Sequence, residues 1–151
     1  MESPSSPRLK VLFLCTANSA RSQLAEALVN HDLGGRFEAF SAGTTPTAPR
    51  PEALRVLGEL GIDHSRARAK SMDDFAGQTF DFVITLCDGA NETCPLFFGG
   101  VRRAHLGFED PARAKGTEDE VLAVFRRVRD LIRRDVEAWL FAHEGESEPG
   151  S

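Results

Sequence analysis

Residues 11–28 constrain the fold of this chain more than any other stretch. Four apolar residues at 11–14 predict a buried strand that stops at Cys15, and a helical pattern begins at about Ala20. Small and polar residues turn the chain between them. A strand–loop–helix of this kind points several backbone N–H groups, together with the positive end of the helix dipole, toward one place. We therefore predict an oxyanion-binding loop built from Cys15, Thr16, Ala17, Asn18, Ser19, Ala20 and Arg21.

The two ends of this loop carry its reactive side chains. Cys15 faces backbone donors and an arginine, which favour the thiolate form and therefore a nucleophile at neutral pH. Arg21 has a planar fork of donors that suits two oxygens of a phosphate or an arsenate, and Ser22 is close enough to donate its hydroxyl proton to the thiolate. A buried structural cysteine on an ordinary turn is the alternative. The spacing Cys-x5-Arg-Ser favours the catalytic interpretation.

The segment from Cys15 to Ser22 (CTANSARS) resembles the signature loop of the low-molecular-weight protein tyrosine phosphatase fold. Phosphatases and thioredoxin-coupled arsenate reductases share that fold. Residues 23–26 (QLAE) and 41–43 (SAG) resemble the reductase branch. The resemblance covers roughly residues 9–141 and implies an α/β fold with a phosphate-binding loop after the first strand.

The rest of the chain alternates between strand and helix patterns, as a parallel sheet with crossover helices requires. Residues 1–8 and the acidic residues 144–151 are expected to be disordered tails, so that residues 9–143 form one catalytic α/β domain. The elements predicted after residue 28 are a second strand at 36–41, a helix at 52–60, a short capped helix at 71–75, a third strand at 80–86, a fourth strand around 103–106 and a long helix from Glu118. They give an open four-stranded parallel sheet flanked by helices.

The long helix from Glu118 carries an apolar stripe that should cover the sheet. The positions of this stripe are Val121, Val124, Phe125, Val128, Leu131, Ile132, Val136 and Trp139. Its arginines at 126, 127, 129, 133 and 134 are interpreted as a solvated face, stabilised by nearby acidic residues.

Composition narrows the possible partners and surroundings. The chain has 151 residues, a net charge of −5 and a pI near 5.4, and its basic residues are scattered or lie on one helix, which argues against a nucleic-acid groove and against a membrane patch. The N-terminal residues lack the apolar core of a signal peptide, and no stretch approaches the length of a membrane span, so we expect a cytoplasmic protein. The three cysteines fit neither a disulfide framework nor a zinc site, so we expect no bound metal.

Cys87 directly follows the third predicted strand, and Cys94 lies seven residues further on. Ligands gather at the carboxyl ends of parallel strands, so Cys87 should lie near Cys15. On an intact helix, seven residues would separate two α-carbons by about 10 Å, whereas a disulfide needs roughly 4.4 to 6.8 Å. We therefore predict a redox switch that is ordered when reduced and looped out when oxidised. The segment matches the thioredoxin-coupled arsenate reductases closely, and a phosphatase has no need of this cysteine pair.

Residues 107–112 (GFEDPA) resemble the stretch that supplies the general acid in the same family. Asp110 is therefore the predicted acid, since Pro111 constrains its turn. Phosphatases of the fold follow Asp-Pro with aromatic residues that grip a substrate tyrosine. This chain has Ala112 at that place and contains no tyrosine.

The resemblance implies a complete reaction. Cys15 attacks arsenate, Cys87 attacks Cys15 and releases arsenite, and Cys94 takes over the disulfide, which thioredoxin reduces. No cofactor is expected to be bound, and phosphate or sulfate should bind as mimics of arsenate. We expect a monomer.

The resemblance also bears on a potassium ion, which lies behind the loop in some reductases of the family. The residues that match its ligands include Asn18, Glu26 and Ser41, but the remaining family positions are here Arg68 and Lys70. An ammonium group in that place argues against a potassium requirement.

Two alternatives stay open at this point. A low-molecular-weight protein tyrosine phosphatase would need Cys15, Arg21 and Asp110, but neither Cys87 nor Cys94. A non-catalytic oxyanion or arsenical sensor would use the thiols as ligands and would have no leaving group for Asp110 to protonate.

Overall fold

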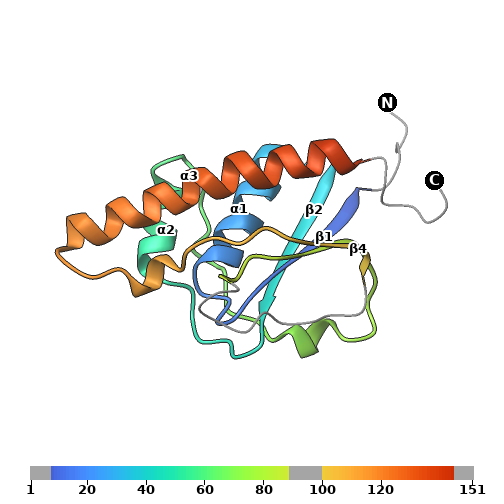
Figure 1. Ribbon diagram of the computed structural model, residues 1–151, viewed down its shortest axis with the longest axis horizontal. Coiled ribbons are helices and arrows are strands. Elements are labelled where there is room, and N and C mark those ends of the chain that lie inside the picture. Colours follow the sequence, from blue (N-terminus) through green and yellow to red (C-terminus); the bar gives the residue numbers. More distant parts are fainter. Residues whose placement is uncertain (1–7, 89–99, 145–151) are drawn as a thin grey trace.

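The computed structural model describes residues 8–88 and 100–144, and these residues are built around a parallel sheet of four strands (Figure 1). The strands are β1 (Leu9–Cys15), β2 (Phe37–Gly43), β3 (Phe80–Thr85) and β4 (Gly100–His105), in the spatial order β2-β1-β3-β4. The most apolar strand, β1, therefore lies in the middle. Its register pairs Cys15 with Gly43 on one side and Leu14 with Thr85 on the other. The predicted open four-stranded parallel sheet is confirmed.

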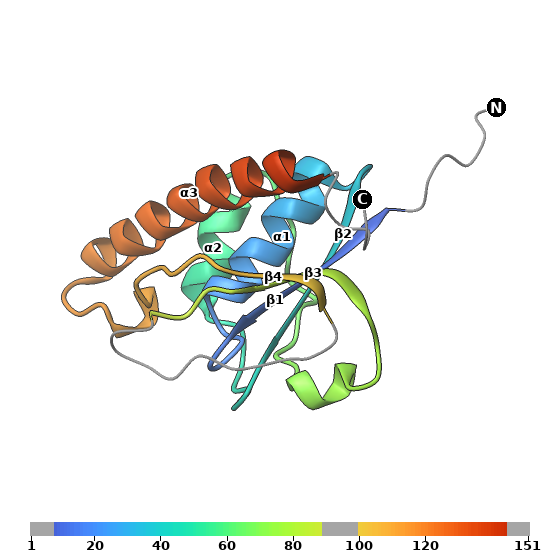
Figure 2. The ribbon, with the colours of Figure 1, turned by 45° about the vertical axis from the view of Figure 1, so that its right-hand side comes forward.

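Three helices, α1 (Arg21–Leu33), α2 (Pro51–Gly58) and α3 (Glu118–His143), cover one face of the sheet (Figures 1 and 2). The start of α3 is fixed by a capping box. The Thr117 side chain accepts the N–H of Glu120 at 3.1 Å, and the Glu120 carboxylate accepts the N–H of Thr117 at 2.8 Å. This exchange satisfies two donors that a helix start otherwise leaves unpaired.

The apolar stripe of α3 is partly displaced from the predicted one. Its buried apolar residues are Leu122, Phe125, Val128, Ile132, Val136 and Leu140. Leu122 and Leu140 were not predicted, and four predicted positions are only partly buried, namely Val121, Val124, Leu131 and Trp139. The displacement follows from the contacts of α3 with both α1 and α2, which the sequence of one helix does not contain.

Arg129 is buried, so the prediction that the arginines of this helix form a solvated face is wrong for that residue. Its Nη1 donates to the Val56 carbonyl at 2.8 Å and pairs with Glu59 at 3.0 Å. A guanidinium with these acceptors can be buried because its charge and its N–H groups are satisfied.

The opposite face of the sheet carries a smaller apolar cluster. Its members are Leu12, Leu14, Ala42, Phe75, Phe80 and Val83. Phe75 comes from a short 3-10 helix, η1 (Met72–Phe75), whose capping box begins at Ser71. The Phe75 and Phe80 rings meet edge to face, with centroids 5.8 Å apart.

The innermost residues of the two predicted tails, Arg8 and Glu144, contact the α/β domain. Arg8 donates to the Gly34 carbonyl at 3.3 Å, and Glu144 pairs with Arg36. The tails beyond them, residues 1–7 and 145–151, lie outside the described residues. Within residues 8–88 and 100–144, no helix has the length and apolar character that crossing a bilayer requires.

Candidate functional site

The loop predicted to bind an oxyanion, residues 15–21, joins the carboxyl end of β1 to the first turn of α1. The side chains of Cys15, Asn18 and Arg21 are all buried there. Because α1 begins at Arg21, the N–H groups of its first turn and the positive end of its dipole face the loop. This end of the sheet is therefore suited to an anion.

The segment between β2 and α2, which was not among the predicted site residues, forms hydrogen bonds with the outer side of the loop. We call this segment, residues 44–50, the strap. Three of its N–H groups donate to carbonyls of the loop: Thr45 to Thr16 at 2.9 Å, Thr47 to Ala17 at 3.1 Å and Arg50 to Ser19 at 2.8 Å. The C=O and N–H of a trans peptide point in opposite directions. Each tied carbonyl therefore turns the next N–H of the loop, at residues 17, 18 and 20, toward the concave side.

Gly43, the last residue of β2, lies against the outer side of the same loop. A Cβ atom at this position would lie 2.5 Å from the Thr16 carbonyl oxygen and 2.9 Å from the Asn18 nitrogen. Both are backbone atoms, which no side-chain rotation can move. Glycine is therefore the residue that lets β2 approach the loop so closely.

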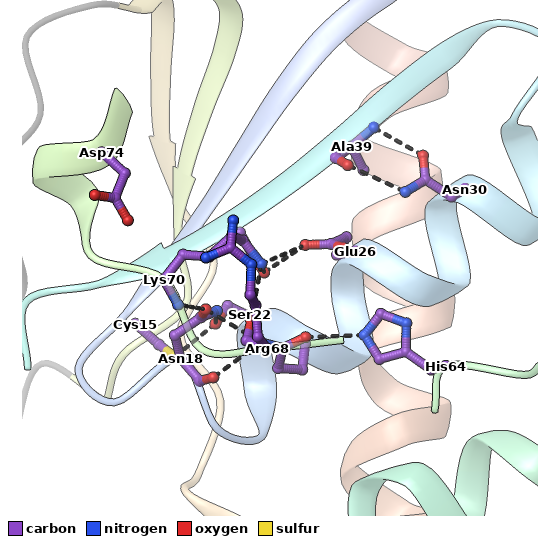
Figure 3. Close-up of polar contacts among 12 residues, drawn as sticks. Cys15, Asn18, Ser22, Glu26, Asn30, Ala39, His64, Arg68, Lys70 and Asp74 are labelled. Atoms are coloured by element: carbon purple, nitrogen blue, oxygen red, sulfur yellow. Dashed lines mark hydrogen bonds and ion pairs between the residues drawn. The ribbon is translucent and has the colours of Figure 1, made fainter. Parts of the chain in front are cut away.

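The sulfur of Cys15 lies at the start of a polar network (Figure 3). Its Sγ is 2.8 Å from Ser22 Oγ, and Asn18 Nδ2 donates to that same oxygen at 2.8 Å. Since Asn18 supplies a proton to Ser22 Oγ, the hydroxyl proton of Ser22 is available to the sulfur. A hydroxyl donor in this position stabilises a thiolate.

Asn18 has a left-handed backbone conformation, with φ of 50°. Asparagine adopts this region more readily than most residues, because its short side chain can hydrogen-bond locally. Here Asn18 Oδ1 accepts the N–H of Lys70 at 2.7 Å, which fixes the orientation of the amide.

Arg21 and Asp110, which are far apart in the sequence, are brought together. Arg21 Nη1 donates to the Phe108 carbonyl at 3.2 Å, and its Nη2 lies 3.7 Å from Asp110 Oδ2. The other carboxylate oxygen of Asp110 accepts the N–H of Ala112 at 2.9 Å. Glu109 pairs instead with Arg127 of α3 at 2.6 Å. Of these two neighbouring carboxylates, Asp110 is therefore the one beside the loop.

Cys87 follows the carboxyl end of β3, beside the end of β1. The N–H of Leu86 donates to the Leu14 carbonyl at 2.8 Å, so a backbone hydrogen bond joins the two residues that precede the cysteines. Cys87 is fully buried and disulfide-bonded, whereas Cys15 is free. The third cysteine of the sequence, Cys94, lies outside the described residues.

Lys70 lies behind the loop, beside Glu26 (Figure 3). Its Nζ is 3.1 Å from the Arg68 carbonyl and 3.5 Å from both Glu26 Oε1 and Ser41 Oγ. The ammonium group thus has oxygen partners of the kind that a hard cation prefers. Within the described residues, no group of three or more His, Cys, Asp or Glu side chains could hold a metal ion.

Two further polar residues, Gln23 and His64, join the network without having been predicted as site residues. Gln23 is fully buried, and its Nε2 donates to Asn18 Oδ1 at 3.1 Å. His64 Nε2 lies 2.8 Å from Gln23 Oε1. Gln23 directly follows Arg21 and Ser22, and this position could have indicated that it belongs to the site. Nothing in the sequence around His64 indicates a role in the site.

The chain is similar to known proteins over most of its length. Residues 10–148 match the family described as low molecular weight phosphotyrosine protein phosphatase. An arsenate reductase of Halalkalibacterium halodurans is 42% identical over 135 residues, which cover 89% of this chain and 96% of that relative.

Solved structures with a similar fold include two arsenate reductases. The first is described as an arsenate reductase in the phosphate binding state; it has a TM-score of 0.75 and 29% identity, over 89% of this chain and 98% of its own. The second is a thioredoxin-dependent arsenate reductase of Corynebacterium glutamicum, with a TM-score of 0.64 and 29% identity, over 91% of this chain and 65% of its own.

Proposed function

The chain belongs to the low molecular weight phosphotyrosine protein phosphatase family, and we propose that it reduces arsenate to arsenite with Cys15, Cys87 and Cys94. The observation that carries this proposal is the pairing of two features at neighbouring strand ends. A free Cys15 lies in an oxyanion loop, and a disulfide-bonded Cys87 follows the adjacent strand. A hydrolytic phosphatase needs the first feature and has no use for the second.

Arsenate binds in the loop through the inward N–H groups and the guanidinium of Arg21. These donors are preorganised, because the strap ties the outward carbonyls of the loop and α1 fixes the backbone of Arg21. Phosphate and sulfate are also tetrahedral anions, so they compete for this site.

The first chemical step forms a bond between sulfur and arsenic. The Cys15 thiolate attacks arsenic, one As–O bond breaks, and the departing oxygen takes a proton from Asp110 and leaves as water. Arg21 neutralises the charge that develops on the remaining oxygens. Asp110 lies beside Arg21 and half-buried, which suits the acid of this step.

The next steps move the oxidation from arsenic to sulfur. The Cys87 thiolate attacks Cys15 Sγ, the S–As bond breaks, and its electron pair stays on arsenic, which leaves as arsenite. Cys94 then attacks Cys87, which frees Cys15 and leaves a Cys87–Cys94 disulfide. Two electrons from the dithiol of thioredoxin reduce this disulfide by exchange. A disulfide-bonded Cys87 together with a free Cys15 is the state expected after Cys94 has attacked Cys87 and before thioredoxin acts.

Lys70 makes a separate monovalent cation unnecessary. Its ammonium group already contacts Glu26 and Ser41. Turnover should therefore be the same in potassium chloride and in choline chloride of equal ionic strength. A specific stimulation by potassium would contradict this assignment.

We further propose that the protein acts as a monomer in the cytoplasm, where thioredoxin keeps protein thiols reduced. Residues 1–8 and 144–151 serve as tails of the catalytic domain at 9–143 and take no part in the chemistry. Truncation of residues 1–7 should therefore leave turnover unchanged, and a loss of activity would contradict this division.

The deciding experiment is arsenate-dependent NADPH oxidation coupled through thioredoxin and thioredoxin reductase. The wild-type protein should consume NADPH only when arsenate and thioredoxin are both present, and glutathione-based coupling should not replace thioredoxin. Peptide mapping after exposure to arsenate should find residues 87 and 94 joined. The relay is wrong if that bridge never forms.

Hydrolysis of a phosphate ester is the second candidate function, because Cys15, Arg21 and Asp110 form a complete set for it. Cys87→Ser separates the two functions: NADPH oxidation should vanish, whereas hydrolysis of an aryl phosphate should persist. A sensor, by contrast, would bind arsenite stably without any arsenate turnover.

A further inference from the structure

A continuous series of hydrogen bonds joins His64 to the sulfur of Cys15 (Figure 3). His64 Nε2 lies 2.8 Å from Gln23 Oε1, and Gln23 Nε2 lies 3.1 Å from Asn18 Oδ1. Asn18 Nδ2 lies 2.8 Å from Ser22 Oγ, which is 2.8 Å from Cys15 Sγ. The three middle residues are fully buried. We call this series the His64 chain.

The surroundings of Gln23 fix the direction of the first link. Gln23 Nε2 faces three acceptors: the Asn18 carbonyl at 3.0 Å, Asn18 Oδ1 at 3.1 Å and the Arg68 carbonyl at 3.0 Å. None of these oxygens can donate, so the NH2 group of Gln23 must point toward them and its oxygen toward His64. Because that oxygen only accepts, His64 must carry its proton on Nε2.

The remaining links run in the same direction. Asn18 Oδ1 accepts from the Lys70 N–H at 2.7 Å, so the NH2 group of Asn18 faces Ser22. Ser22 Oγ accepts that proton and directs its own toward Cys15 Sγ. Every donor therefore points toward the sulfur. Aligned hydrogen bonds polarise one another, and this polarity favours a negative charge at the last acceptor.

We propose that His64 is a positioning residue for the nucleophile: by donating to Gln23, it aligns the His64 chain and raises the fraction of Cys15 present as thiolate. The proposal rests on Cys15 being the nucleophile of the proposed reaction. His64 itself touches neither the oxyanion loop's concave side nor the sulfur, and acts only through Gln23.

Burial keeps His64 in its neutral form. Burial lowers the pKa of His64 below its ordinary value. Of the charged groups that face it, Lys70 also lowers the pKa, whereas Glu26 and Asp63 raise it. At neutral pH the imidazole is therefore uncharged, with one N–H to donate.

The test measures thiolate reactivity rather than arsenate turnover. In a Cys87→Ser/Cys94→Ser background, Cys15 is the only cysteine, and its alkylation by iodoacetamide is followed across pH by mass spectrometry. His64→Ala should slow alkylation at pH 7 by about three- to tenfold, the effect of one lost hydrogen bond, and should move the half-maximal rate to higher pH. His64→Gln, whose amide can donate in place of the imidazole, should recover most of the rate.

Two comparisons separate this role from a merely structural one. His31→Ala removes an exposed histidine whose Nδ1 contacts Asp32, and it should leave the profile unchanged. His64→Phe keeps an aromatic ring at this position and loses the N–H, so it replaces His64→Ala if the alanine variant does not fold.

Two outcomes would overturn the proposal. One is a profile for the folded His64 variant that superposes on that of the background protein. The other is an equal reduction at every pH, which would mean that His64 only supports the fold. Because alkylation requires no arsenate, neither outcome depends on whether the protein reduces arsenate.

Discussion

Substitution of Gly43 by alanine tests whether the shape of the oxyanion loop depends on its contact with β2. The added Cβ would meet the Thr16 carbonyl oxygen at 2.5 Å, the Asn18 nitrogen at 2.9 Å and the Ala17 carbonyl carbon at 3.1 Å. Ordinary contact begins at 3.4 Å. The loop backbone must therefore move by about 0.9 Å at Thr16, away from β2.

A displacement of this size acts on the backbone atoms that are proposed to bind the oxyanion. A misplacement of about 1 Å costs on the order of 100-fold in rate when it affects the reacting groups. We therefore expect Gly43→Ala to reduce kcat/KM for arsenate by about 100-fold. The strain should also lower the free energy of unfolding by about 1–3 kcal/mol, as other overpacked sites do.

The assay is arsenate-dependent NADPH oxidation through thioredoxin, with urea unfolding measured on the same samples. Gly58→Ala is the matched control, because a Cβ there would meet nothing within 4 Å and the residue lies in α2. That variant should keep full activity and gain up to about 1 kcal/mol of stability. If Gly43→Ala kept the wild-type kcat/KM and unfolding free energy, the argument that this contact shapes the loop would be refuted.

Three further predictions concern single side chains. Asp110→Asn removes the proposed proton donor and should lower arsenate turnover by about 100-fold or more in the coupled assay, while iodoacetamide should still alkylate Cys15. Burial and the hydrogen bond with Asp32 raise the pKa of Glu137 from 4.5 to about 8, so the folded protein holds a proton that the unfolded chain releases. Stability should therefore fall as pH rises from 4.5 through about 8, and Glu137→Gln should flatten the Tm profile. Thr117→Ala removes the cap of α3 and should cost about 1 kcal/mol in urea unfolding.

Each of these three predictions can be contradicted by a specific result. Unchanged turnover in Asp110→Asn would assign the proton donation to another group. A Tm profile for Glu137→Gln that parallels the wild type would show that this carboxyl group is not the source of the pH dependence. A Thr117→Ala variant of unchanged stability would mean that the capping box contributes nothing to the fold.

The main elements could be predicted because their signals are local. The apolar run at 11–14 and the helical pattern after it predicted β1, the loop and α1. Cys87 comes two residues after the end of β3, and the parallel strands place it at the same end of the sheet as Cys15. Side chains were harder to place. Arg129 looks like a surface residue in its own helix, and only the approach of α2, with the Val56 carbonyl, makes its burial possible.

The sequence by itself determined the α/β fold and predicted the oxyanion loop and its reactive residues, since periodicity and spacing within about 20 residues carry that information. The tertiary structure alone decided what supports them. Gly43 and the strap act on the loop from outside it, and His64, in the loop after α2, reaches Cys15 through Gln23 of α1. The direction of a hydrogen bond and the closeness of two backbones depend on three-dimensional position, and residues far apart in the chain leave no periodic trace of such contacts.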